Sequence, residues 1–317
     1  MSYLRSFAPV VLVLTMVGGA PASDKQARRP AGEKAAPPRV LRIGAVAYAP
    51  SALTVFQNLR RYFAKHDLPI DYVLYSNYDA LVEALRKGHV DIAWNTPLAH
   101  ARYHLLCNGH SQTLAMRDVD CNFRCKLLVR KASGIQSAAG LQGKTLALGS
   151  REAAEATVLP LHYLQKEGVT LEKVKLLRLD EEVDLRGNPC SSPLHVLKAL
   201  RAGRADAGIV GERLWNDLVS RKAAEVEGLQ AVWTSPSFSH CVFTAAKDFD
   251  KSVAARFRRL MLAMDGKDAC TAEILRLEGA SKWVAGSSNG FETLIDALRA
   301  ERGKRTKSAG QGGQLGR

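Results

Sequence analysis

The chain has 317 residues, a formal net charge of +14, and 46% hydrophobic residues. Part of the positive charge lies in the two ends of the chain, and neither a zinc-finger spacing nor an RNA-binding aromatic signature occurs, so we expect no nucleic-acid partner. The segment between the ends is about 260 residues long, which is at the size where one hydrophobic core stops growing and two lobes become the expected organisation.

The N-terminus has the composition of an export signal. An uncharged, apolar-rich run covers residues 6–20 and ends in Ala20-Pro21-Ala22, a small-x-small cleavage pattern. The run is shorter than a bilayer-spanning helix, so residues 1–22 are predicted to be a cleaved signal peptide of a periplasmic protein. A buried N-terminal helix and a membrane anchor are the alternatives. Residues 23–39 are predicted to be a flexible leader and residues 303–317 a disordered tail.

An oxidising compartment permits disulfides, and the chain has six cysteines: Cys107, Cys121, Cys125, Cys190, Cys241 and Cys270. Many pairings are open to six cysteines, so the connectivity does not follow from the sequence. A bridge between Cys121 and Cys125, or from this pair to Cys107, is one possibility. Several buried free thiols are the other.

Strands and helices alternate from the start of the folded part. The apolar runs 40–48, 70–75 and 90–94 have the composition of strands, and the segments 53–66 and 78–89 between them have helical spacing. This β-α-β-α-β order is typical of a parallel sheet flanked by helices.

The same order returns in the second half. Strands are predicted at 126–131, 144–149, 174–179, 205–211, 231–235 and 241–246, helices at 152–167 and 193–203, and mainly helix from 252 to 300. Both halves contain an amphipathic helix, a glycine turn and a strand that opens with Asp, in ALVEALRKGHVDIAW and HVLKALRAGRADAGIV. Open α/β sheets bind ligands beyond the carboxyl ends of their strands, so two such lobes predict a cleft that closes on a ligand.

These segments carry a family resemblance. RIGAVAY, SNYDALVEALRKGHVDIAWNTPLAHA, KLLVRKASGIQSAAGLQGKTLALGS and PLHVLKALRAGRADAGIV, in this order, resemble the phosphonate-type (PhnD-like) periplasmic solute-binding proteins of ABC importers. The resemblance implies the α/β type II periplasmic-binding-protein fold, with two lobes, each a mainly parallel sheet flanked by helices. Lobe one would comprise residues 40–124 and 238–302, and lobe two residues 125–237.

The function that the resemblance implies is binding without chemistry. A monomeric protein would capture a small polar solute by hinge closure and deliver it to a membrane ABC permease, with no cofactor. A receptor that presents its ligand to a membrane sensor kinase would have the same sequence features. No nucleophile elbow, P-loop, zinc-protease or dinucleotide-binding motif argues for an enzyme.

The chain departs from the family where phosphonate binders carry a Ser-Thr-Ser-Gly run at a helix start in lobe two. The corresponding residues here are Ala153, Ala154, Glu155 and Ala156, so three hydroxyls are missing and a carboxylate is added. Glu155 is either a contact for an amine-bearing ligand or a first-turn residue that interacts with the helix dipole. Arg151, next to Ser150, is either an oxyanion partner or a solvated loop residue.

Further ligand contacts are predicted at strand ends and helix starts. In lobe one these are Tyr48, Tyr78, Asn95 and Thr96, and in lobe two Asp206 and Glu212. Asn95 stands where phosphonate binders often have an aromatic residue, and it suits a polar ligand. Asp206 has a second interpretation, because Asp91 is its counterpart in lobe one and both could anchor the helix-to-strand turn.

A metal site is the rival hypothesis. His100, His104 and Cys107 lie on one face if residues 97–107 form a helix, and imidazole with thiolate suits zinc or copper. The alternative is that both histidines pack as partly buried polar residues. A periplasmic metal-binding or ligand-sensing protein is therefore the alternative function.

Overall fold

The computed structural model describes residues 39–47, 49–151, 153–181 and 192–300, all within one compact unit, Pro38–Arg317. The predicted signal peptide, nearly all of the leader, the tail, Tyr48 and Cys190 therefore lie outside the described residues. Within these ranges, no helix has the length and apolar character needed to cross a membrane.

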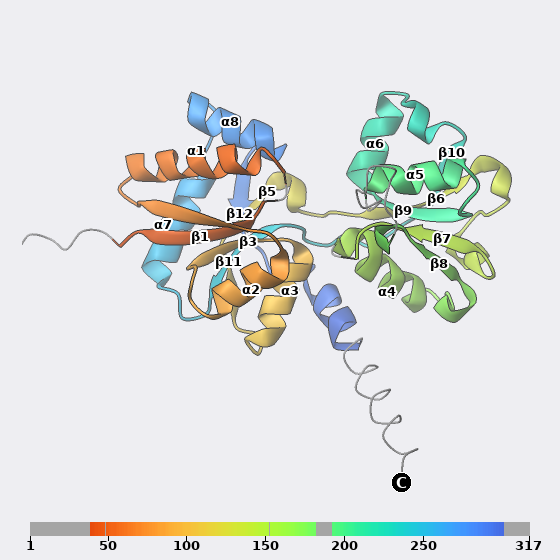
Figure 1. Ribbon diagram of the computed structural model, residues 1–317, viewed down its shortest axis with the longest axis horizontal. Helices are drawn as coiled ribbons and strands as arrows, with labels where there is room; N and C mark the ends of the chain where they lie inside the picture. Colours follow the sequence, from red (N-terminus) through yellow and green to blue (C-terminus); the bar gives the residue numbers. More distant parts are fainter. Residues whose placement is uncertain (1–38, 48, 152, 182–191, 301–317) are drawn as a thin grey trace, which may run out of the picture. The chain divides into compact units, whose positions relative to one another are not determined.

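Two five-stranded sheets form the frame of the fold (Figure 1). The first has the strand order β2-β1-β3-β11-β4. Its strands are β1 (Leu41–Val46), β2 (Ile70–Tyr75), β3 (Ile92–Asn95), β4 (Ser111–Thr113) and β11 (Val242–Ala246). β1 pairs in parallel with β2 and β3, whereas β11 runs antiparallel to β3 and β4.

The second sheet repeats this plan in the order β10-β6-β9-β7-β8. Its strands are β6 (Cys125–Arg130), β7 (Thr145–Leu148), β8 (Lys175–Arg178), β9 (Ala207–Gly211) and β10 (Leu229–Thr234). β7 pairs in parallel with β8 and β9, and β6 runs antiparallel to β9 and β10. A short pair, β5 (Ala115–Arg117) with β12 (Trp283–Ala285), completes the strands.

Helices cover both faces of each sheet. Their bounds are α1 (Ala52–Lys65), α2 (Tyr78–Arg86), α3 (Pro97–Leu106), α4 (Leu159–Lys166), α5 (Pro193–Arg201), α6 (Glu212–Ser220), α7 (Lys251–Leu262) and α8 (Ala269–Glu278). On the first sheet, α1, α7 and α8 share one buried cluster with Ile43, while α2 and α3 share another with Ala93. On the second, α5 and α6 pack on Ala147, and α4 packs on the opposite face with Leu146. Alternate strand residues thus serve opposite cores.

The glycine turn and strand-opening Asp form the same anchor in both sheets. Gly88 and Gly203 end their helices in the left-handed region, at φ of +70° and +72°. Asp91 Oδ2 accepts the backbone N–H of Arg42 at the start of β1, at 2.8 Å. Asp206 Oδ2 accepts that of Thr145 at the start of β7, also at 2.8 Å. Each carboxylate therefore fixes the register between a turn and the neighbouring parallel strand.

The structure confirms the α/β type II fold, corrects one detail and decides one open alternative. The sheets are mixed rather than mainly parallel, because β6, β10, β11 and β4 add antiparallel pairs to a parallel core. The described cysteines are free, so neither Cys121 nor Cys107 is bridged to Cys125. Cys125 is buried at the start of β6, where it packs as a small hydrophobe.

Two chain segments connect the first sheet with the second and run beside each other. One follows β5 and includes the short turn η1 (Asp118–Asp120); the other follows β10. They are hydrogen-bonded in antiparallel fashion, with the Phe123 N–H donating to Phe238 O at 2.8 Å and the Phe238 N–H donating to Phe123 O at 2.9 Å. The backbone pairing fixes the position of the side chains on both connections.

Candidate ligand pocket

The helix that follows β7 begins without a side-chain cap. A π-helical turn, η4 (Ala154–Val158), leads into α4, and Ala153 before it is extended, at φ −95° and ψ 108°. The first N–H groups of a helix have no partner within the helix, and Ser or Thr at this point commonly accepts one of them. Ala153 offers no such oxygen, so the start of this helix depends on other groups.

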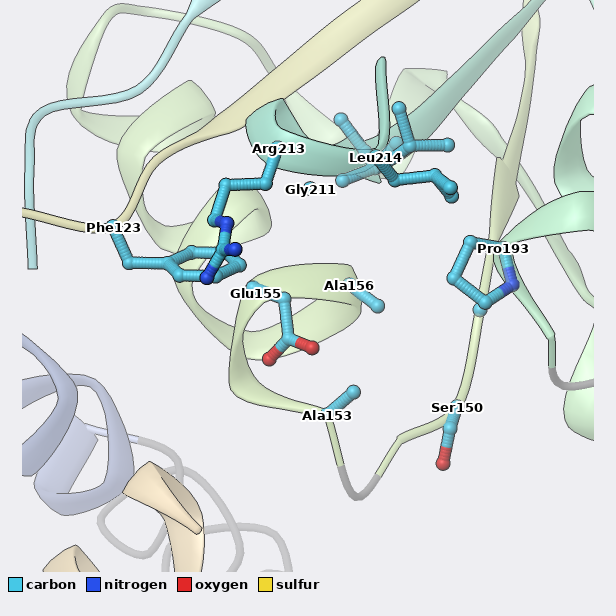
Figure 2. Close-up of a pocket in the computed structure, with 12 residues that line it drawn as sticks. Phe123, Ser150, Ala153, Glu155, Ala156, Pro193, Gly211, Arg213 and Leu214 are labelled. Carbon is cyan, nitrogen blue, oxygen red and sulfur yellow. The ribbon is translucent and has the colours of Figure 1, made fainter. Parts of the chain in front are cut away.

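A pocket of about 480 Å³ opens at this helix start. Its walls come from the connection before β6, the loop after β7, η4, the end of β9, and the starts of α5 and α6. The lining residues are Phe123, Gly149, Ser150, Ala153, Glu155, Ala156, Pro193, Ile209, Val210, Gly211, Arg213 and Leu214. Figure 2 shows the Glu155 carboxylate and the Arg213 guanidinium among side chains that are otherwise mostly apolar. The pocket therefore combines apolar walls with one acid and one base.

Glu155 is held by a histidine from the second connection. Its Oε2 lies 3.4 Å from Nε2 of His240, and its side chain is 22% exposed. Burial acts to raise the pKa of Glu155, but the nearby His240 outweighs it and lowers that pKa. Burial likewise opposes a charge on His240, whereas Cys241, Glu155 and Asp120 together raise its pKa well above the usual value. The two side chains form an ion pair.

The other candidates in lobe two have different surroundings. Arg151 donates to Asp180 Oδ2 at 2.8 Å and to Glu181 Oε1 at 2.7 Å, so its charge is engaged within the loop. Glu212 pairs with Lys126 at 3.0 Å. Ser150 lines the pocket, and Ala154 is fully buried in the core beneath it. Asp206 serves as the anchor of β7, which is the second of its two predicted roles.

In lobe one, Asn95 and Thr96 lie where β3 ends and α3 begins. Asn95 is fully buried, and neither its Nδ2 nor its Oδ1 has a hydrogen-bond partner among the described residues. Thr96 caps α3 by accepting the N–H of Ala99 at 3.3 Å. Tyr78 begins α2, and burial followed by the proximity of Cys241 raises its pKa. Asn95 is thus the candidate whose polar atoms are still unsatisfied.

The rival metal set does not form. His100 is buried and its Nδ1 contacts the Thr244 hydroxyl at 2.9 Å, while Nδ1 of His104 contacts the Ser111 hydroxyl at 2.9 Å. Burial lowers the pKa of both imidazoles, and that of His100 falls to about 3. Both histidines lie on α3 as expected, but nearby hydroxyls contact them individually instead of a shared ion. They are polar residues packed against the sheet.

Sequence reasoning missed three contributors. Arg213 directly follows the predicted Glu212, and only the direction of α6 decides which of the two lines the pocket. Phe123 was not predicted as a contact, yet it lines the pocket and stacks on His240 with ring centroids 4.5 Å apart. His240 lies in a loop 85 residues after Glu155 in the sequence, and no local pattern joins the two. The adjacent His240-Cys241 pair was the one available signal.

Comparison with known proteins agrees with this architecture. A curated relative, the probable ABC transporter phosphite binding protein PhnD1 of Prochlorococcus marinus, is 21% identical over 277 residues, covering 83% of this chain and 90% of its own. The solved structure of PhnD1 from that organism in complex with methylphosphonate has a TM-score of 0.63 at 19% identity, covering 83% of this chain and 98% of its own. XAC2383 from Xanthomonas citri, bound to ATP, has a TM-score of 0.65 at 20% identity, covering 83% and 98%. At these identities, the structural likeness shows the fold.

The family itself is shown by its sequence model. The model described as "ABC transporter, phosphonate, periplasmic substrate-binding protein" matches residues 44–289, most of the chain. The protein therefore belongs to the phosphonate-type periplasmic substrate-binding proteins of ABC transporters. These are non-enzymatic transport components, which agrees with the lack of catalytic motifs in the sequence.

Proposed function

We propose that this protein binds a small zwitterionic solute, of the aminoalkylphosphonate class, and delivers it to the permease of its ABC transporter. The observation that supports this class is the pair of opposite charges, Glu155 and Arg213, on the wall of one apolar-lined pocket. A ligand with an ammonium group and an oxyanion separated by a short carbon chain would complement all three features: acid, base and apolar wall.

Arg213 is the proposed partner of the oxyanion. It is exposed at the start of α6, and among the described residues it has no ion-pair partner, in contrast to Arg151. A guanidinium presents paired donors that match a phosphonate or carboxylate in a bidentate arrangement. Arg213 would supply in this chain the anion contact that serine and threonine hydroxyls supply in phosphonate binders.

Glu155 is the proposed partner of the amine. Its Oε2 lies 3.4 Å from Nε2 of His240, and the same carboxylate lines the pocket, where it can accept from a ligand. An ammonium group is a donor only, and it matches a carboxylate that His240 alone does not saturate. A ligand that had only an oxyanion would meet this carboxylate as a like charge.

Closure of the two lobes on the ligand is part of the proposal. Asn95 at the end of β3 has an amide without partners, and an amide can both donate to and accept from a polar ligand. Binding favours a closed state only through its greater affinity for that state. Hydrogen bonds that the Asn95 amide makes only in the closed state would provide part of that difference in affinity.

The ligand class is tested by calorimetric titration of three solutes with the same carbon skeleton: aminoethylphosphonate, ethylphosphonate and ethylamine. We expect aminoethylphosphonate to bind at least about tenfold more tightly than either of the others, because each charged contact contributes roughly 1.5–3 kcal/mol. Arg213→Gln should weaken both phosphonates, and Glu155→Gln should remove the preference for the amino compound.

Arg151→Gln is the matched control, because its guanidinium is engaged by Asp180 and Glu181 outside the pocket. This variant should bind like the wild type. Equal affinity for ethylphosphonate and aminoethylphosphonate would contradict the role of Glu155. Wild-type affinity in Arg213→Gln would remove Arg213 from the site.

We also propose that residues 1–22 are cleaved on export. Residues 6–20 are uncharged and apolar-rich, and a small-x-small pattern follows them. N-terminal sequencing of the protein secreted into the periplasm should begin at Ser23. Recovery of a chain that still begins at Met1 would argue against cleavage.

A further inference from the structure

A second cluster of polar side chains lies beside the pocket, on the two connections between the sheets. Asp120 closes the turn η1 on the first connection, and His240 with Cys241 precedes β11 on the second. The backbone N–H of His240 donates to the backbone carbonyl oxygen of Asp120 at 2.8 Å, as part of the antiparallel pairing of these connections. Residues that are 120 positions apart are therefore held together by backbone hydrogen bonds as well as by their side chains.

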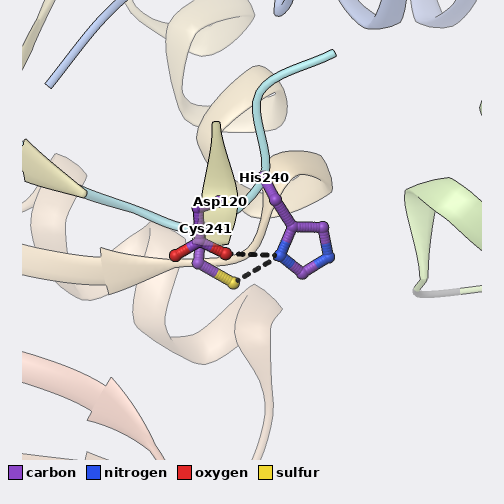
Figure 3. A group of neighbouring side chains, drawn as sticks. All are labelled: Asp120, His240 and Cys241. Carbon is purple, nitrogen blue, oxygen red and sulfur yellow. Dashed lines mark hydrogen bonds and ion pairs between the residues drawn. The ribbon is translucent and has the colours of Figure 1, made fainter. Parts of the chain in front are cut away.

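The three side chains converge on one point. Nδ1 of His240 lies 3.0 Å from Asp120 Oδ1 and 3.2 Å from Cys241 Sγ (Figure 3). All three ligand atoms lie within 4.8 Å of one another, and the described residues contain this one such group. Around a tetrahedral zinc ion, bonds of about 2.0–2.3 Å place neighbouring ligand atoms roughly 3.3–3.8 Å apart. The two distances from His240 Nδ1 are within a few tenths of an ångström of this spacing, and the third ligand pair lies within 4.8 Å.

Further contacts hold two of the three side chains in place. Nε2 of His240 faces the Glu155 carboxylate, while the ring itself stacks on Phe123. Asp120 accepts from Arg117 at 2.6 Å and 2.8 Å. In metal sites, a ligating histidine characteristically donates its second ring nitrogen to a carboxylate, and a ligating carboxylate is itself hydrogen-bonded. Both of these supporting contacts are present here.

The cluster is sheltered from solvent. The side chains of Asp120 and His240 are 1% and 15% exposed, and Cys241 is buried. Arg117 introduces a positive charge close to the ligands, but Glu278 also accepts from it, at 3.0 Å. Thiolate, imidazole and carboxylate together form a ligand set that zinc accepts and that magnesium and calcium do not favour.

We propose that Asp120, His240 and Cys241 bind a zinc ion through Oδ1, Nδ1 and Sγ. Zinc binds the thiolate of Cys241 and an unprotonated Nδ1 of His240, so any proton on these two atoms is released to solvent when the ion binds. The Glu155 contact with Nε2 is retained. The fourth position of the tetrahedron is open to water or to an oxygen of a ligand. The site does not depend on which solute the pocket binds.

The experiment uses the full chain without an affinity tag, freed of metal with a chelator and then titrated with zinc chloride in a calorimeter. We expect one equivalent to bind. His240→Gln and Cys241→Ser should each weaken zinc at least tenfold, because each removes a direct ligand. The matched controls, His104→Gln and Cys270→Ser, replace the same residue types outside the cluster and should bind zinc like the wild type.

Cobalt(II) provides a readout that a merely structural role would not change. A cobalt–thiolate bond gives a near-ultraviolet charge-transfer band, which we expect in the wild type and in His104→Gln and not in Cys241→Ser. Zinc bound well below one equivalent, or a cobalt complex of the wild type without this band, would overturn the proposal even if Cys241→Ser failed to fold. Solute titrations carried out in chelator keep a failure here distinct from a failure of the proposed ligand class.

Discussion

The two sheets follow one plan, yet the helices at their strand ends begin differently. After β3, Thr96 caps α3 with its own hydroxyl and Pro97 fits the first turn. After β7, η4 begins as a π-helix with no side-chain cap, and Glu155 stands in its first turn. At the first helix start, a side chain of the helix's own cap residue accepts a backbone N–H. At the second, no capping side chain does so, and the N–H groups are left for other acceptors. The comparison shows that the helix start without a side-chain cap is the one that lines the pocket.

The two anchoring carboxylates, Asp91 and Asp206, test whether equivalent positions in the two lobes contribute equally to stability. Asp91→Ala should lower the free energy of unfolding by about 2–3 kcal/mol, because a hydrogen bond to a charged group in a protected site is lost. Asp206→Ala should cost about half as much, since its side chain is 36% exposed against 7% for Asp91. Urea unfolding measures both. Asp71→Ala, in an exposed ion pair, is the control and should change little.

Replacing Glu155 with serine, a residue of the hydroxyl run of phosphonate binders, tests how the start of η4 affects anion binding. Glu155→Ser should raise the affinity for ethylphosphonate about tenfold, or ~1.4 kcal/mol, because a like charge is removed and His240 loses its carboxylate partner. Isothermal titration of the variant against the wild type measures this change. An unchanged or weaker affinity would show that the carboxylate does not repel anions at this position.

The caps themselves provide a smaller and reciprocal test. Thr96→Ala should destabilise the protein by about 1 kcal/mol, and Ala153→Ser should stabilise it by somewhat less, because the new hydroxyl accepts a helix N–H. The extended backbone of Ala153 already suits a capping residue. Thermal unfolding of the two variants gives opposite shifts in Tm. No gain from Ala153→Ser would mean that the first N–H groups of η4 already have acceptors.

The smallest effect is expected at Arg151, the basic residue outside the pocket. Burial tends to raise the pKa of Asp180, but its hydrogen bonds from Arg151 lower it below the usual value. A carboxylate with a lowered pKa contributes stability above its unfolded-state pKa, and that contribution disappears as the pH falls through the folded-state pKa. Arg151→Gln should therefore lower the free energy of unfolding only slightly at neutral pH, because the ion pair is exposed to solvent.

The difference between Arg151→Gln and the wild type should shrink as the solution is acidified below about pH 4, when Asp180 becomes protonated in both. Urea unfolding at a series of pH values follows this change. A difference that stays constant into acid would mean that packing of the Arg151 side chain, and not its charge, accounts for the effect.

The sequence by itself determined most of the elements of this protein and their order, although β4, β5, α6 and β12 were not predicted. Helical spacing in 53–66, the glycine turns before Asp91 and Asp206, and the apolar strand runs are local patterns, and each was found where it was predicted. Periodicity and turn chemistry act over a few residues, so they can be recognised without the fold. The order of these elements also carried the resemblance from which the family was expected.

Only the tertiary structure decided which side chains meet. Glu155 with His240 and Asp120 with Cys241 come from segments separated by 85 and 121 residues, and no local pattern connects them. The choice of Arg213 over Glu212 as the pocket residue depends on how α6 is rotated against β9, which packing settles. Backbone pairing of the two connections brings His240 and Cys241 close to the acidic side chains. Hydrogen bonding between such distant segments becomes defined only once both sheets have formed, so the sequence alone does not reveal it.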